Sequence, residues 1–430
     1  MGSETDSLRV NAARADITPS TLLPLFGRAR RSGAARTIAS RLEANVLLFD
    51  APDGLAAIIA IDSLYASQQL EDEVRRQTAA RGLSFSQGAL LFVASHTHNA
   101  PSLDPTKPRL GPFDVGYLDF AAARITEALL VARSQHNGVA RVAHGQALCA
   151  ASTFRRRAVA GIDLARLRVS KRVVMAPDAR VAIDQRLKLL LLSGADQTPR
   201  AVLWSWPCHA VSEPDAMALS ADFPGALRGH IRNTLGVADL PVLYFPGFSG
   251  DIRPASRPFV PLHRSATWIG VGPRFAPANA AAAATLHAAL ARAFDAAFAL
   301  RQDAGGLSQA MVRRQRRHLA LDTIRTDAGS LAPLTCDDWA IGPIRIMAVS
   351  AEVAAAYAPR SGRADPLTFV TGCAGQAFGY VPTDSQIHEG GYEVNGFATD
   401  FSVPGRFRDQ IERAVFALIG QQVQDGGPEA

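Results

Sequence analysis

The stretch that decides the fold of this chain is Ala89-Leu90-Leu91-Phe92-Val93-Ala94-Ser95-His96-Thr97-His98-Asn99-Ala100-Pro101. Its apolar first half has the length of a strand and is bounded by Gly88 and Pro101, so it predicts a buried β-strand. Two histidines one residue apart follow this apolar run. Residues i and i+2 of an extended chain point to the same side, so we expect both imidazoles to converge on one metal ion.

The composition of the 430 residues is that of a globular protein, with 48% hydrophobic and 20% charged residues. The chain is long enough to bury a large core, and no linker composition divides it. The net charge of +6 forms no basic stripe with interleaved aromatic residues, so nucleic-acid binding is not expected. No apolar run approaches the length of a membrane span, so stable membrane insertion is not expected either.

The first residues and the cysteines indicate the compartment. Residues 1–7 carry acids and are followed by no apolar segment, which is not the pattern of a signal peptide. The four cysteines are widely separated in a chain too large to need disulfides. We therefore expect a cytoplasmic protein with free thiols.

Strand and helix patterns alternate on both sides of the quoted stretch. Upstream, the turn Pro52-Asp53-Gly54 separates two apolar runs and predicts a β-hairpin. The predicted strands cover about 8–13, 45–49, 56–62, 139–146, 187–192, 201–206, 241–245, 310–320, 344–349 and 367–371. The predicted helices cover about 67–81, 115–134, 223–235, 276–301 and 408–421. This order predicts a single α/β domain with mixed β-sheets flanked by helices.

A third histidine also follows a predicted strand. The run 201–206 ends in Pro207-Cys208-His209, and the strand at 241–245 leads into a loop with two glycines, 246–254. Strand ends and glycine-containing loops commonly carry sites, because backbone can approach a ligand closely there. Taken alone, each histidine could instead cap a strand or bond the backbone.

Ordered motifs along nearly the whole chain resemble those of the neutral, or alkaline non-lysosomal, ceramidase family. Ala94–Pro101 resembles the family's Ser/Thr-His-Thr-His-Ser-Gly-Pro segment. Further matches, in chain order, are Arg14-Ala15-Asp16-Ile17-Thr18, Ser220-Ala221-Asp222-Phe223-Pro224-Gly225, Gly250-Asp251-Ile252-Arg253-Pro254 and Gly379-Tyr380-Val381-Pro382-Thr383. The resemblance implies a ceramidase-like catalytic domain over 1–430, without the immunoglobulin-like C-terminal domain of the ceramidases.

The resemblance also implies a metal site with one zinc ion per chain. Its ligands would be His96, His98, His209, Glu352 and Tyr380. Three imidazoles, a carboxylate and a phenolic oxygen suit Zn²⁺ and leave a position for a water molecule, whose pKa the ion lowers to about 7. Such water can attack an amide carbonyl. By the same resemblance, Tyr392 lies beside the reacting carbonyl and donates to the developing oxyanion.

One arginine departs from the family's pattern, and two others resemble it. Arg253 stands where ceramidases carry a serine proposed as nucleophile, and a permanently protonated guanidinium cannot attack. We therefore expect direct attack by zinc-activated water, with Arg253 clamping a carboxylate or stabilising the oxyanion; the alternative is an exposed loop arginine. Ser249 could take the serine's role only in a shifted loop. Arg156 and Arg157 resemble a paired-arginine segment and are expected to line the pocket and select an anionic substrate, or else to form a solvated basic turn.

These features predict a zinc-dependent amidohydrolase that acts on a small acyl-bearing metabolite. Ceramide itself is not the expected substrate. Ceramidases act on membrane lipid from outside the cell, and the first residues of this chain do not have the pattern of a secretion signal. One alternative keeps the zinc and changes the chemistry to ester or lactone hydrolysis, acyl transfer or cyclisation. A second alternative is a non-catalytic binding protein derived from the enzyme.

Overall fold

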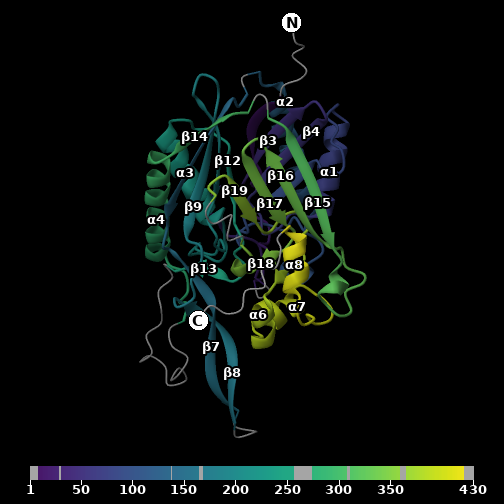
Figure 1. Cartoon of the computed structure of the whole chain (residues 1–430), viewed down its shortest axis with the longest axis vertical. Coiled ribbons are helices and arrows are strands. Elements are labelled where there is room, and N and C mark those ends of the chain that lie inside the picture. Colours follow the sequence, from purple (N-terminus) through teal and green to yellow (C-terminus); the bar gives the residue numbers. More distant parts are fainter. Residues whose placement is uncertain are drawn as a thin grey trace.

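The computed structural model describes residues 8–28, 31–136, 138–163, 168–255, 274–307, 310–358 and 365–420 (Figure 1). Residues 1–7, on which the signal-peptide prediction depends, lie outside these ranges, as does residue 421 at the end of the last predicted helix. The chain builds an α/β fold with mixed sheets and flanking helices, which confirms the predicted fold class.

The first sheet contains the strand that precedes the two histidines. Its strands, in spatial order, are β1 (Arg9–Asp16), β3 (Glu43–Ala51), β4 (Gly54–Ile61) and β5 (Leu90–Ala94). β3 and β4 form the predicted antiparallel hairpin, and β5 runs parallel to β4. Helices α1 (Gln68–Ala79) and α2 (Val115–Ser134) pack on one another, and α2 packs on β1 and β3.

The second sheet provides the strand that precedes the third histidine. Its spatial order is β12 (Val242–Phe245), β10 (Pro199–Ser205), β9 (Arg186–Ser193), β6 (Arg141–Leu148) and β14 (Gln302–Gly306). Helix α4 (Ala280–Ala299) packs on β6 and β9 and also contacts α3 (Asp222–Leu235). In Figure 1, α4 lies at the left edge and α1 at the right, with the sheets between them.

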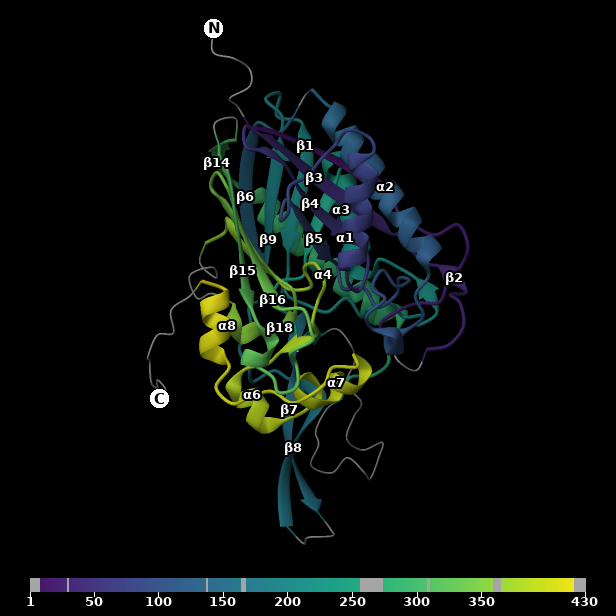
Figure 2. The ribbon, with the colours of Figure 1, turned by 90° about the vertical axis from the view of Figure 1, so that its right-hand side faces the viewer.

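Further strands complete the fold. A third sheet has the order β15 (Val312–Leu319), β16 (Leu334–Ile341), β17 (Ile344–Val349) and β19 (Thr368–Thr371). A smaller sheet has the order β13 (Ile252–Pro254), β7 (Ser152–Asp163) and β8 (Arg168–Asp178). Its β7–β8 hairpin projects from the body in both views (Figures 1 and 2). Two short pairs are β2 (Thr37–Ile38) with β11 (Ala218–Leu219) and β18 (Glu352–Val353) with β20 (Tyr380–Val381). The C-terminal helices are α6 (Asp384–Glu389), α7 (Phe397–Asp400) and α8 (Glu412–Leu418).

Strand β5 is buried on both faces. Leu90, Phe92 and Ala94 belong to the core that contains the buried residues of α1 and α2. Leu91 and Val93 belong to the core between the sheets. Alternate side chains of a strand point to opposite faces, so the continuous apolar run reflects two separate cores rather than one.

Strands β7, β8 and β16 were not predicted, because charged residues interrupt their apolar pattern. β7 carries Arg155-Arg156-Arg157, and β16 carries Asp337 and Asp338. The charges of β16 are matched across the sheet, where Arg316 and Arg317 of β15 bond Asp337 and Asp338. Cross-strand ion pairs therefore replace the apolar alternation on which a sequence-based prediction relies. In the described part of the chain no helix is both long and apolar enough to cross a membrane.

A buried charge cluster ties α3 to the β3–β4 hairpin. Both carboxylate oxygens of Glu43 accept hydrogen bonds of 2.7 Å from Arg232, and Arg228 donates to Asp62 at 2.7 Å. Burial acts to raise the pKa of Glu43, but the Arg232 hydrogen bonds and the charges of Arg228 and Arg14 outweigh it, so the net pKa is lowered. The ionised carboxylate therefore stabilises the fold at neutral pH.

We predict that Glu43→Gln lowers the free energy of unfolding by about 3 kcal/mol at pH 7, because it leaves buried guanidinium groups without their counter-charge. A carboxyl with a lowered folded pKa contributes stability above its ordinary value of 4.5 and loses it as the pH falls. Urea unfolding at several pH values should show the two proteins converging below that value. A difference that does not change with pH would contradict this, and Glu127→Gln, on a part-exposed ion pair with Arg124 within α2, is the control that should behave as wild type.

Candidate metal centre

Three histidines meet where two sheets end. His96 and His98 follow β5, and His209 follows β10. An isolated parallel bridge joins Thr97 to Ala210, so each loop holds the other beside its histidines. One ring nitrogen of each imidazole lies within 4.8 Å of those of the other two. The group is therefore compact enough to bind a single metal ion.

The convergence of His96 and His98 does not come from an extended strand, and that part of the prediction is wrong. β5 ends at Ala94, and His96 has a backbone φ of +61°, in the left-handed region. The two rings are nevertheless 5.0 Å apart between centroids. A strained backbone conformation at a functional position, rather than strand periodicity, turns His96 inward.

Backbone carbonyls orient all three imidazoles. In each ring Nδ1 lies near a carbonyl oxygen: 3.2 Å for His96 and Leu64, 2.9 Å for His98 and Gly27, and 2.9 Å for His209 and Ser249. Nδ1 must be the protonated nitrogen to donate to a carbonyl, which leaves the Nε2 lone pair for the interior of the site. Gly27 has a φ of +101°, and a Cβ there would lie 2.9 Å from His98 Nδ1, so this close approach needs glycine.

Glu352 completes the group from the start of β18. Its Oε2 lies 3.2 Å from His96 Nε2 and 2.9 Å from His209 Nε2, while the Tyr65 hydroxyl donates to its Oε1. Three buried atoms, His96 Nε2, His98 Nε2 and Glu352 Oε2, make no well-formed hydrogen bond, although Glu352 Oε2 lies at ion-pair distance from His96 Nε2. Buried polar atoms are almost always satisfied, and a cation among these would satisfy all three. Three imidazoles and one carboxylate are a donor set that fits Zn²⁺.

The protonation states of two of the three histidines and of the carboxylate suit a metal. Burial and the charges of His96, His209 and Arg28 lower the pKa of His98. Burial and the charge of Arg155 lower the pKa of His209 to about 3. Burial acts to raise the pKa of Glu352, but the neighbouring imidazoles outweigh it, so that pKa is lowered. Burial acts to lower the pKa of His96, but the charges of Cys373 and Glu352 outweigh it, so the pKa of His96 is raised and a metal ion would have to displace a proton from this imidazole.

The two predicted tyrosines lie on one side of the histidines. The Tyr380 hydroxyl is 3.3 Å from His209 Nε2, and β18–β20 pairing places Tyr380 opposite Glu352. Burial and the Glu352 charge raise the pKa of Tyr380, so this phenol stays protonated without a cation beside it. Tyr392 lies one ring further out, 5.7 Å from Tyr380 between centroids, and its hydroxyl donates to Asp400 at 3.1 Å.

Arg155 is a site residue that the sequence did not single out. It is 3% exposed, and its Nη1 donates to His209 Nε2 at 2.9 Å, a hydrogen bond that a metal ion bound to this nitrogen would displace. Its Nε donates to Glu393 at 2.7 Å, and its Nη2 is buried without a partner. A β-bulge between Phe154 and Arg156 sets the direction of this guanidinium. No sequence pattern predicts a bulge there, so Arg155 could not be distinguished from the two arginines that follow it.

The other predicted arginines have protein partners of their own. Arg156 is 3% exposed on β7, so the alternative of a solvated turn is wrong for it. It donates to Glu393 and to the carbonyl of Gly390, each at 2.7 Å, and lines a cavity of about 510 Å³ beside α6. Arg157 donates to the carbonyl of Pro177 at 3.4 Å. Their predicted role in substrate selection stays a prediction.

The loop after β12 contributes backbone rather than side chains to the histidines. Ser249 is buried, and its carbonyl is the acceptor for His209. Arg253 lies on β13, where its Nη1 donates to Met175 Sδ at 3.2 Å and its guanidinium lies 5.1 Å from the centroid of the Phe275 ring. Met175 belongs to β8 of the hairpin. A direct role of Arg253 at the reacting atoms stays a prediction.

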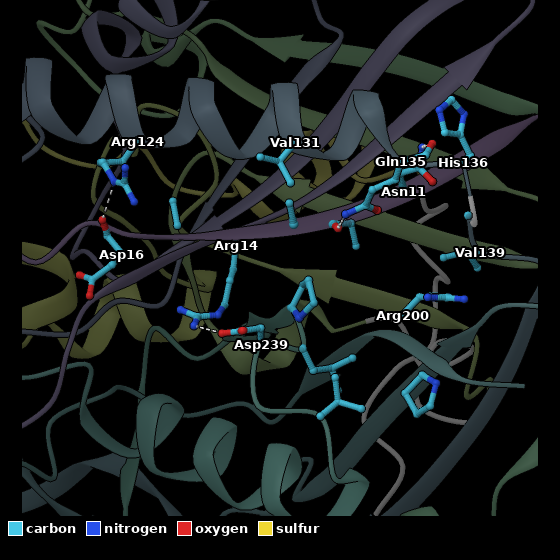
Figure 3. A pocket seen from close by; sticks show the side chains of 18 residues that line it. Asn11, Arg14, Asp16, Arg124, Val131, Gln135, His136, Val139, Arg200 and Asp239 are labelled. Atoms are coloured by element: carbon cyan, nitrogen blue, oxygen red, sulfur yellow. Dashed lines mark hydrogen bonds and ion pairs between the residues drawn. The ribbon is translucent and has the colours of Figure 1, made fainter.

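A larger cavity lies elsewhere, between β1, α2 and the start of β10 (Figure 3). Its volume is about 750 Å³, and its lining includes none of the three histidines. Its charged groups have partners: Arg14 bonds Asp239, and Arg124 forms an ion pair with Glu127 and donates to the carbonyl of Asp16 at 3.3 Å. It brings together no group of metal ligands or nucleophiles, so the histidine cluster is the candidate site.

Fold and site together define an α/β protein with a buried group of three histidines that could bind a metal. Two solved structures share the fold: "neutral ceramidase from Pseudomonas aeruginosa", with a TM-score of 0.71, and "Ceramidase complexed with C2", with a TM-score of 0.70. Each is 13% identical to this chain and is matched over 99% of it, covering 76% and 77% of the respective neighbour. No family model matches the sequence, and no curated protein does. The chain therefore has a ceramidase-like fold, as its motifs predicted.

We predict that Tyr65→Phe weakens zinc binding about 10–100-fold, because the hydroxyl holds Glu352 Oε1 and thereby directs Oε2 toward the histidines. Competition with a chromophoric chelator would measure the dissociation constant. The matched control is Tyr117→Phe, which removes another buried hydroxyl, one without a hydrogen-bond partner, from a different wall of the core. Equal affinities for the two variants would contradict the assigned role.

Proposed function

We propose that this protein is a zinc-dependent hydrolase that cleaves an amide bond in a small acyl-bearing molecule. His96, His98, His209 and Glu352 would hold the metal, with Tyr380 as a further ligand beside His209. The observation that carries the proposal is the compact buried group of three histidines with Glu352, in which His96 Nε2, His98 Nε2 and Glu352 Oε2 make no hydrogen bond and Glu352 Oε2 lies 3.2 Å from His96 Nε2. The ceramidase-like fold supports the same class of chemistry.

Zinc bound by these residues would polarise a carbonyl oxygen and activate a water molecule for attack at neutral pH. The chain supplies the remaining groups. Arg155 is permanently charged, lies beside His209, and has one free buried nitrogen, so it is the donor best placed to stabilise negative charge on the carbonyl oxygen. Glu393 fixes that guanidinium through its bond to Nε. Tyr392 could add a second donor once its hydroxyl leaves Asp400.

Attack by water without a covalent acyl-enzyme fits the available side chains. Arg253 cannot be a nucleophile, because its guanidinium stays protonated. Ser249 comes from the loop whose carbonyl orients His209, so moving that loop would disturb a metal ligand. Direct hydrolysis by water, without an acyl-enzyme, therefore needs the least rearrangement of this site.

The test is turnover of a panel of acyl compounds by zinc-loaded protein. We expect release of free acid from N-acyl amides, and a His96→Ala/His98→Ala double variant should lose zinc and lower kcat/KM by at least about 1,000-fold, since both the Lewis acid and the activated water are lost. His230→Ala, on a part-exposed histidine paired with Asp295, is the matched control and should keep both properties.

Two outcomes would replace this proposal. Turnover of esters or lactones with no release of acid from any amide would assign the site to a zinc-dependent esterase or lactonase. Zinc binding with no turnover of any acyl compound would favour a non-catalytic binding protein. Activity in the zinc-free double variant would overturn the metal mechanism itself.

A further inference from the structure

Two more arginines lie beside the histidine cluster, in the loop that follows β1. Arg31 Nη1 donates to the carbonyl of His98 at 2.8 Å. Arg28 directly follows Gly27, whose carbonyl accepts from His98 Nδ1 at 2.9 Å. Arg28 therefore directly follows a residue whose backbone contacts this imidazole, and the Arg31 side chain contacts the backbone of His98 itself.

The charges of these two arginines are not matched inside the protein. Across the described ranges, no carboxylate oxygen lies within 4.0 Å of either guanidinium, in contrast to Arg155 and Arg156, which share Glu393. Arg31 Nε and Nη2 are buried without a hydrogen-bond partner. Buried guanidinium nitrogens without acceptors are costly, and an oxyanion is their usual partner.

The burial and the charges around Arg28 and Arg31 also favour binding of an anion. Burial lowers the pKa of Arg31 to about 10, and the charge of Arg28 adds to the effect. Three acids, Glu213, Asp215 and Asp222, offset these charges from a longer range. The Asp222 carboxylate already accepts from the backbone N–H groups of Ser212 and Glu213. Two half-buried cations that repel one another thus keep unused capacity for an anion.

The arginines also lie on the accessible side of the candidate centre. His98 is the one part-exposed member of the histidine group, whereas His96 and His209 are each 2% exposed. A substrate that reaches the centre from solvent would approach past His98. The same approach brings it to Arg28 and Arg31.

We propose that Arg28 and Arg31 bind a carboxylate on the substrate, so that the enzyme prefers amides of N-acyl amino acid type over neutral amides. This inference rests on the proposed hydrolase function and specifies its substrate class. The planar forks of two guanidinium groups can bind a carboxylate in bidentate fashion, which gives orientation as well as affinity. The bound anion would supply the acceptors that Arg31 Nε and Nη2 lack.

The test compares N-hexanoylglycine with its neutral isostere N-hexanoylglycinamide, using zinc-loaded full-length protein and release of hexanoic acid as the readout. The Arg28→Gln/Arg31→Gln double variant should lower kcat/KM for N-hexanoylglycine about 100-fold, as expected for loss of two or more charged hydrogen bonds. For the neutral amide the change should stay within about 3-fold, the scale of a surface substitution. Arg31→Lys, which keeps the charge but not the fork, should fall between wild type and the double variant.

Zinc content and unfolding temperature of the double variant must match wild type, because Arg31 also contacts the backbone of a metal ligand. Arg133→Gln, on a part-exposed ion pair with Asp50, is the control arginine and should leave both substrates unaffected. An equal loss on both substrates, or no loss on either, would overturn the assignment.

Failure of the hydrolase proposal can be separated from failure of this inference. If wild type releases acid from neither amide, titration calorimetry of N-hexanoylglycine with zinc-loaded protein measures the carboxylate site directly. Affinity about 100-fold weaker in the double variant would support the site without the reaction. Equal affinity in the two proteins would overturn it.

Discussion

The candidate centre depends on three hydrogen bonds between histidine Nδ1 atoms and backbone carbonyls of Leu64, Gly27 and Ser249. Each bond favours the tautomer with the proton on Nδ1, and together they turn the three Nε2 atoms toward the interior of the group, where His209 Nε2 accepts from Arg155. The acceptors come from separate parts of the chain, so the imidazoles are oriented only when the two main sheets and their loops are assembled. The glycine at 27, the left-handed turn at His96 and the Thr97–Ala210 bridge are local consequences of this requirement. Stability and metal binding should therefore be closely coupled.

Charge around the centre is arranged in two different ways. Arg155 and Arg156 share Glu393, which neutralises part of their charge and fixes Arg155 beside His209. Arg28 and Arg31 have no such partner within ion-pair distance in the described structure, and they lie on the side where His98 is part-exposed. The first arrangement suits a preorganised donor that should not move during reaction. The second suits side chains that bind a charged ligand. Arg28 and Arg31 lie at positions other than those that the sequence suggested for this role, which were Arg156, Arg157 and Arg253.

Much of the fold and the grouping of the three histidines could be predicted from the sequence, and the failures have specific causes. The apolar run of β5, the hairpin β3–β4 and helix α2 were predicted because burial patterns and turn residues are local properties. The histidines and Glu352 were found through ordered motifs, although the expected extended geometry at His96 is wrong. Strands β7 and β16 were missed because their charges are paired with other strands or with Glu393. A β-bulge places Arg155 at the site, and loop contacts place Arg28 and Arg31 there. No residue spacing along the chain predicts either feature.

The central claim is that the three Nε2 atoms and Glu352 hold one zinc ion. X-ray absorption at the zinc edge of the purified, zinc-loaded protein tests it most directly, because distance distinguishes nitrogen and oxygen ligands from sulfur. Cys373 is the candidate for a sulfur ligand, because its Sγ lies 3.4 Å from His96 Nδ1. The account predicts only nitrogen and oxygen neighbours at about 2.0–2.2 Å, with imidazole scattering that disappears together with the metal in the His96→Ala/His98→Ala variant. A sulfur shell at about 2.3 Å, or zinc that stays bound in that variant, would contradict it.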